Sequence, residues 1–199
     1  MMTYIVWIMT FLITLTVHEY AHGKAAFFLG DNTAMRLGRL SFNPFKHVDF
    51  FWTIILPGIL LLMNLPPVGM AKPVPVNFMN LRNPKKDMIW VALAGPLANI
   101  CFAVLLSFFY RNFKLPFLLY PIYLNIGLAV FNLLPIPPLD GGRVLAGFLP
   151  DGFAYAFGKI ERFGVLLVFA LVYTGFLHKI LIPSMRFFCE LLRVPFFLS

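Results

Sequence analysis

Two histidines and a glutamate interrupt the first apolar segment of the chain. His18, Glu19 and His22 follow seventeen residues that include no charged side chain. On an α-helix, positions 18 and 22 lie one turn apart on the same face, so both imidazoles can reach one ion. Glu19 lies beside them, close enough to contact a water molecule on that ion. The spacing is the His-Glu-x-x-His pattern of zinc sites.

This trio predicts hydrolytic zinc chemistry. A catalytic zinc takes three protein ligands and keeps a fourth position open, and His18 and His22 supply two of the three. Zinc lowers the pKa of a bound water toward 7, and Glu19 can take its proton and pass it to a leaving amine. A chance match is the alternative. It is disfavoured because an ionised residue near the centre of a membrane segment costs up to about 3 kcal/mol.

Asp140 is the candidate for the third ligand. It ends the proline-rich stretch 132–140 and is followed by two glycines, which we expect to let the chain bend there. Its carboxylate could instead cap the next helix, but two histidines that lack a third ligand favour the zinc role. His47, in a loop, is a second candidate, for which a structural or gating role is favoured.

The composition is that of a membrane protein. Of 199 residues, 60% are hydrophobic and only 12% are charged, against about 25% charged in a soluble domain. We expect one integral membrane domain over residues 1–199, with a catalytic core of about 1–150. The net charge of +8 fits loops that face the cytoplasm and anionic lipid better than nucleic acid, because no basic run alternates with stacking aromatics. Cys101 and Cys189 lie in apolar segments and predict no disulfide framework.

The hydrophobic pattern predicts an all-α polytopic fold. We expect a core of three transmembrane helices, a re-entrant segment, a short membrane-associated β-hairpin and one or two further C-terminal helices. The last segment either spans the membrane or lies in its interface. The expected ranges are helices at 3–28, 86–110, 116–134 and 156–176, the hairpin at 33–42, the apolar run at 50–63 and a last apolar segment at 180–198.

The zinc ligands decide the path of residues 50–63. This run is shorter than the ~20 residues that a span needs, so it crosses only if residues 64–70 are added. A crossing would leave Asp140 a membrane thickness away from His18. A re-entrant path would bring Asp140 beside the histidines and would place most Lys and Arg residues on one side, which is then cytoplasmic, with the N-terminus outside.

These motifs, in this order, resemble the site-2 protease family of intramembrane zinc metalloproteases. The resemblance covers roughly residues 1–150 and rests on three stretches: His18-Glu-Tyr-Ala-His22, Gly95-Pro-Leu-Ala-Asn99 and Asn132-Leu-Leu-Pro-Ile-Pro-Pro-Leu-Asp140-Gly-Gly. The stretches Asn43-Pro-Phe-Lys-His47 and Ala71-Lys-Pro-Val-Pro-Val-Asn77 look like the compact bacterial or archaeal members, and no stretch looks like a PDZ or CBS domain.

The resemblance implies a role for each of these residues. His18, His22 and Asp140 would bind one catalytic zinc, and Glu19 would be the general base. Asn99 and Asn132 would help to hold substrate. The 33–42 hairpin would line the cleft and pair with an unwound substrate as an added strand.

The expected function is that of an intramembrane zinc metalloendopeptidase, which cleaves in or near transmembrane segments of membrane proteins during regulated intramembrane proteolysis. Its partners would be a transmembrane protein substrate and the lipid bilayer, with no nucleic acid. It would be a multi-pass protein of a prokaryotic cell membrane, with its active site nearer the cytoplasmic face. The alternative is a catalytically silent pseudoprotease that binds membrane segments, which a Gln at position 19 would have favoured. The sequence does not indicate an oligomeric state.

Overall fold

The computed structural model describes residues 2–63 and 71–197, which form helices joined by irregular segments, with no strand among them. The longer helices are α1 (Met2–Phe28), α4 (Pro84–Phe113), α5 (Leu119–Asn132), α6 (Asp140–Phe148), α7 (Asp151–Tyr173) and α8 (Phe176–Leu191). The short ones are α2 (Thr33–Arg36), η1 (Pro44–Lys46), the π-helix η2 (Phe50–Ile55), α3 (Leu56–Leu62), η3 (Phe78–Asn80) and η4 (Pro116–Leu118).

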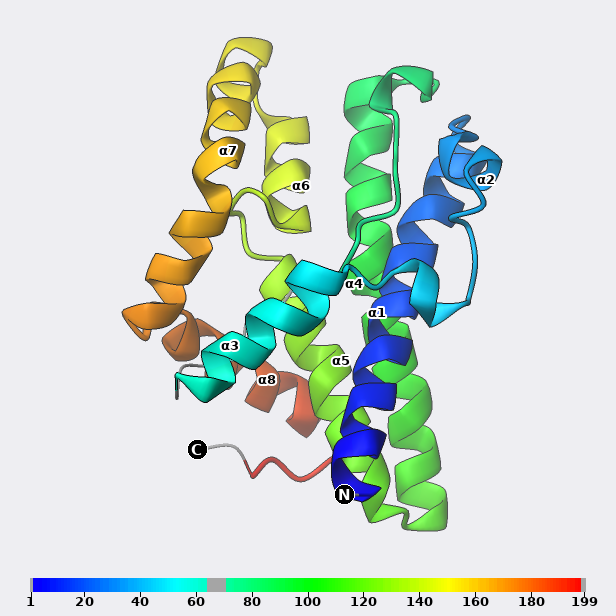
Figure 1. Ribbon diagram of the computed structural model, residues 1–199, viewed down its shortest axis with the longest axis vertical. Helices are drawn as coiled ribbons and strands as arrows, with labels where there is room; N and C mark the ends of the chain where they lie inside the picture. Colours follow the sequence, from blue (N-terminus) through cyan, green and yellow to red (C-terminus); the bar gives the residue numbers. More distant parts are fainter. Residues whose placement is uncertain (1, 64–70, 198–199) are drawn as a thin grey trace.

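Three helices pass along the same bundle in alternating directions. Figure 1 shows α1 and α4 side by side and running oppositely, with α5 returning between α4 and the C-terminal helices. α6 then packs against the first half of α4, and α7 and α8 flank the bundle. The third pass brings Asp140, the first residue of α6, next to His18, which lies sixteen residues after the first residue of α1.

Small residues on α4 allow this close packing. Gly95 faces α1, and the fully buried Ala103 lies in one cluster with Ile122 and Ile126 of α5 and Cys189 of α8. Small side chains bring helix axes close together, which is how helices associate where water is absent. Small side chains thus let α1, α4 and α5 pack closely in this core.

The outer surface and one long helix indicate a membrane protein. α4 is long and apolar enough to cross a bilayer, and a second span exists if α7 and α8, which meet at 77°, are one broken span. Large apolar side chains such as Trp7, Ile13, Leu105 and Phe108 are exposed, as lipid contact requires. The predicted three-helix transmembrane core is thus supported in part, by one clear span among the described residues.

The predicted β-hairpin at 33–42 is wrong. Residues 33–36 form α2, and turns that include Gly38, at φ 62°, follow it. The cause is Asp31, a buried carboxylate that accepts hydrogen bonds from the backbone N–H of Thr33 (3.0 Å) and of Asn77 (2.7 Å) and from the Asn80 amide (3.0 Å). Burial alone would raise the pKa of Asp31, but hydrogen bonds, first of all that from the Thr33 hydroxyl (2.5 Å), outweigh it and lower the pKa below its usual value. The bonds from Thr33 start a helical turn where the side-chain alternation suggested a strand, and those from residues 77 and 80 hold Asp31 in place.

The segment between residues 47 and 72, which includes η2 and α3 and is called the excursion below, begins and ends at one place. The Asp49 carboxylate caps η2 by accepting from the N–H groups of Phe51 and Trp52, each at 3.0 Å. The Lys72 N–H donates to the His47 carbonyl at 2.9 Å, so the chain is back beside its starting point by residue 72. α3 lies obliquely across the bundle (Figure 1). Residues 64–70, which the crossing alternative needed, lie outside the described residues.

Candidate metal centre

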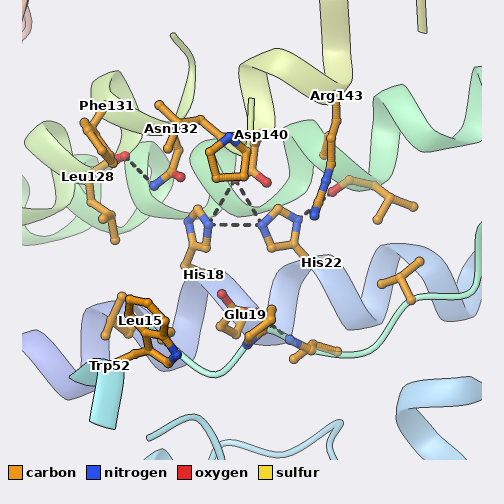
Figure 2. A pocket seen from close by; sticks show the side chains of 18 of the residues that line it. Leu15, His18, Glu19, His22, Trp52, Leu128, Phe131, Asn132, Asp140 and Arg143 are labelled. Atoms are coloured by element: carbon orange, nitrogen blue, oxygen red, sulfur yellow. Dashed lines mark hydrogen bonds and ion pairs between the residues drawn. The ribbon is translucent and has the colours of Figure 1, made fainter. Parts of the chain in front are cut away.

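Side chains from two helices meet at one point. His18 Nε2 lies 3.0 Å from His22 Nε2, and Asp140 Oδ2 lies 3.1 Å from the first and 3.2 Å from the second (Figure 2). All three residues are buried. Within residues 2–63 and 71–197, this is the one group of three or more His, Cys, Asp or Glu side chains arranged to hold a metal.

Hydrogen bonds on the far side of each ring fix the proton positions. His18 Nδ1 lies 2.6 Å from the Asn99 side-chain oxygen, and His22 Nδ1 lies 2.7 Å from the Val91 carbonyl. Both partners are acceptors, so each Nδ1 carries the hydrogen and each neutral imidazole has its lone pair on Nε2. The atoms that face one another are therefore two lone-pair nitrogens and a carboxylate oxygen.

This donor set fits zinc. Asp140 Oδ2 is buried and has no hydrogen-bond partner, and three electron-rich atoms in contact repel one another unless a cation lies between them. Tetrahedral zinc, with bonds of about 2.0–2.1 Å, would place its ligand atoms about 3.3 Å apart. The observed separations of 3.0–3.2 Å are close to that value.

Two glycines place Asp140 at this point. Leu139 is the N-cap residue of α6, and Asp140 turns its carboxylate toward the histidines rather than capping the helix. A Cβ on Gly141 would collide with the Leu133 carbonyl, and one on Gly142 would lie 2.8 Å from the Ile136 carbonyl carbon. Both glycines are helical, so they serve close packing against the preceding turn rather than the bending that the sequence suggested.

A third glycine brings α4 onto the histidines. A Cβ on Gly95 would collide with His22 Nε2 and would lie 2.7 Å from His18 Cε1. Only a residue without a side chain allows α4 to lie so near the rings. Gly95, the first residue of the stretch Gly95-Pro-Leu-Ala-Asn99, therefore packs directly against both imidazole rings.

Glu19 is held by a segment that sequence reasoning did not assign to the site. The Val74 N–H donates to Glu19 Oε2 at 2.7 Å. Arg39 in turn holds this segment, donating to the carbonyls of Lys72 (3.0 Å) and Pro73 (3.2 Å). The stretch 71–77 carried a signal, because its alternating prolines favour an extended chain that cannot pair as a central strand.

An apolar cavity of about 480 Å³ opens onto the ligands and Glu19. Trp52 of η2 and Leu56 of α3 form one wall, and Val165 and Phe169 of α7 line it as well. Residues 71 and 73–76 line it too, but no residue of 33–42 does. The expected pairing of a hairpin with substrate in the cleft therefore has no structural basis.

The two candidate substrate-binding asparagines lie in different places. Asn132 lines the cavity, and its amide donates to the Leu128 carbonyl at 3.0 Å. Asn99 is fully buried behind His18 and does not line the cavity, which favours a role in holding the ring. His47 lies outside the metal group, with Nε2 2.8 Å from the Ser41 carbonyl.

Comparison with known proteins gives consistent matches. Residues 111–173, which include Asp140, match peptidase family M50. "Putative zinc metalloprotease YwhC" of Bacillus subtilis is 32% identical over 194 residues, 90% of this chain and 85% of that protein. "Putative zinc metalloprotease Rip2" of Mycolicibacterium smegmatis is 31% identical over 176 residues, 84% of this chain and 66% of that protein. No solved structure matches significantly.

Replacing Gly95 by alanine tests the packing of α4 on the histidines. We expect Gly95→Ala to abolish stoichiometric zinc binding, because the new methyl group would occupy the space of both imidazoles. Metal analysis of the purified protein measures this directly. Gly127→Ala in α5 is the matched control, because its methyl group would meet only the flexible end of Met185, at 3.3 Å. Full zinc content in Gly95→Ala would show that α4 does not set the site.

Proposed function

This chain belongs to peptidase family M50, the site-2 proteases, and from that premise we propose that it cleaves peptide bonds in or near transmembrane segments of other proteins. The relatives confirm the expected zinc metalloprotease class. The intramembrane location of cleavage is the proposal. The observation that supports it most is that the metal ligands and Glu19 open onto an apolar cavity between lipid-compatible helices.

The depth of the ligands supports cleavage within the membrane. His18 lies about 24 Å along α1 from its first residue at 1.5 Å per residue, and the hydrocarbon core is about 30 Å thick. The residues of α1 that precede it carry no charge. A substrate that reaches the site from the side would therefore be a membrane-embedded segment.

Each site residue has a definable part in peptide hydrolysis. His18, His22 and Asp140 would hold the metal, and Asn132, on the cavity wall, would contact the substrate backbone. Bound zinc supplies Lewis-acid polarisation of the carbonyl and activation of water. Glu19, held at one oxygen by the Val74 N–H, takes the proton of the attacking water and delivers it to the leaving amine.

The chemistry favours an unwound substrate. The carbonyl of a helical residue is hydrogen-bonded within its helix, and unwinding exposes it to attack.

We further propose a multi-pass protein of a prokaryotic cell membrane, with α1, α4 and α5 crossing and the site nearer the cytoplasm. The support is the contact between residues 47 and 72, which returns the excursion to its starting side. Lys85 and Lys86 then mark the cytoplasmic start of α4, and Arg111 and Lys114 its other end.

The pseudoprotease alternative is not favoured. A silent relative would be expected to lack the general base or a ligand. Here Glu19 is present and held beside a complete ligand set.

The proteolytic proposal is tested by comparing new protein termini in cells that express the wild type or Glu19→Gln. Gln keeps an oxygen that can accept from the Val74 N–H but cannot take a proton, so we expect zinc to be retained and cleavage to fall at least 100-fold. Quantitative mass spectrometry of membrane-protein N-termini should find wild-type-dependent cuts in or within about ten residues of apolar spans. Identical termini in both strains, or cuts confined to soluble domains, would contradict the proposal.

The orientation is tested with single cysteines in a Cys101→Ser, Cys189→Ser background. A thiol reagent that does not cross membranes should label Lys114→Cys in intact cells and Lys86→Cys only after permeabilisation, because the two positions flank α4. Labelling in the reverse order would overturn the orientation, and labelling of both in intact cells would overturn the span.

A further inference from the structure

Three fully buried polar side chains lie behind His18. Thr14 of α1, Asn99 of α4 and Asn125 of α5 are each 0% exposed, and none lines the cavity. A buried amide or hydroxyl group is costly in an apolar interior unless it is hydrogen-bonded. Three such groups on three helices indicate that they have a specific role in this structure.

The orientation of the Asn99 amide is determined by its surroundings. Asn99 Nδ2 lies 2.9 Å from Asn125 Oδ1 and 3.3 Å from the Thr14 carbonyl, and both are acceptors. The two hydrogens of the amide are used there, so Asn99 Oδ1 must face His18 Nδ1 at 2.6 Å. The reversed amide would set its oxygen against two oxygens.

The Asn125 amide is fixed in the same way. Its Nδ2 donates to the Thr14 hydroxyl at 3.0 Å and to the Pro121 carbonyl, one turn earlier on α5, at 2.9 Å. Its oxygen is thereby turned toward Asn99. All the donors point the same way: the His18 ring on α1 donates to Asn99 of α4, and Asn99 donates to Asn125 of α5.

We propose that Asn125 is a positioning residue of the zinc site, which acts through Asn99 to fix the tautomer of His18. With Asn99 Oδ1 as acceptor, His18 Nδ1 carries the hydrogen and Nε2 presents its lone pair to His22 and Asp140. If Asn99 turned its NH2 group to the ring instead, Nε2 would carry the hydrogen and could not bind a metal. The inference deepens the proposed function and rests on its zinc site.

A second buried polar residue of α4 gives the comparison. Ser107 is also 0% exposed, but its hydroxyl donates to the Ala103 carbonyl of its own helix at 2.6 Å. This hydrogen bond stays within α4 and does not lead to His18 or the other candidate metal ligands. Loss of Ser107 therefore reports the general cost of removing a buried polar group from this bundle.

The test compares Asn125→Leu and Asn125→Ala with Ser107→Ala, using full-length metal-free protein in detergent. Leucine keeps the bulk without the amide, and alanine serves if leucine does not fold. Zinc affinity is measured against a competing chelator, and the imidazole nitrogens are observed by ¹⁵N NMR. We expect the zinc Kd to rise about 10- to 100-fold in the Asn125 variants and by less than about 3-fold in Ser107→Ala, with mixed His18 tautomers only in the former.

A double variant distinguishes an effect of Asn125 that acts through Asn99 from a general effect on packing. In an Asn99→Ala background, Asn125→Leu should weaken zinc binding by less than about 3-fold, because the residue through which it acts is absent. Additive losses, an equal loss in Ser107→Ala, or an unchanged His18 tautomer would overturn the proposal. If the wild type binds zinc and the Asn125 variants bind it equally, the inference alone fails. If the wild type binds no zinc, the proposed function fails with it.

Discussion

Two imidazole nitrogens and one carboxylate oxygen, all on buried residues, lie 3.0–3.2 Å apart. Because His18 Nδ1 and His22 Nδ1 carry the hydrogens of the neutral rings, these three atoms present only lone pairs to one another. Their mutual repulsion is relieved by a cation, and the geometry is near that of tetrahedral zinc. The rest of the structure brings these atoms together from the two ends of the stretch 18–140.

Close packing and directed hydrogen bonds share this task. Glycine at 95, 141 and 142 lets backbones approach where any side chain would collide. The hydrogen bond between residues 47 and 72 returns the chain to its starting point, and α5 then ends beside α1. Asn99 and Val74 then hold the side chains of His18 and Glu19. These contacts join residues that are far apart in the sequence, and they rely on the packing of the same three-helix core.

The sequence predicted the parts of the site whose signal is local or chemically constrained. His18 and His22 share a helix face, and Asp140 followed from the need for a third ligand and from the path that would bring it near. The hairpin failed because the hydrogen bonds of Asp31 come partly from residues 77 and 80, which no local pattern reveals. Asn125 and Val74 were missed for the same reason. Their importance lies in the direction of long-range hydrogen bonds, which exists only after helices pack.

The most direct test of the account is the zinc content of the detergent-purified protein, wild type against Asp140→Ala. Asp151→Ala is the control, because it removes an exposed carboxylate that pairs with Lys85 outside the cavity. The account predicts about one zinc per chain in the wild type and the control, and much less in Asp140→Ala, since two histidines alone hold zinc weakly. Equal zinc in all three proteins would remove Asp140 from the site and with it the convergence of α1 and α6 on the metal.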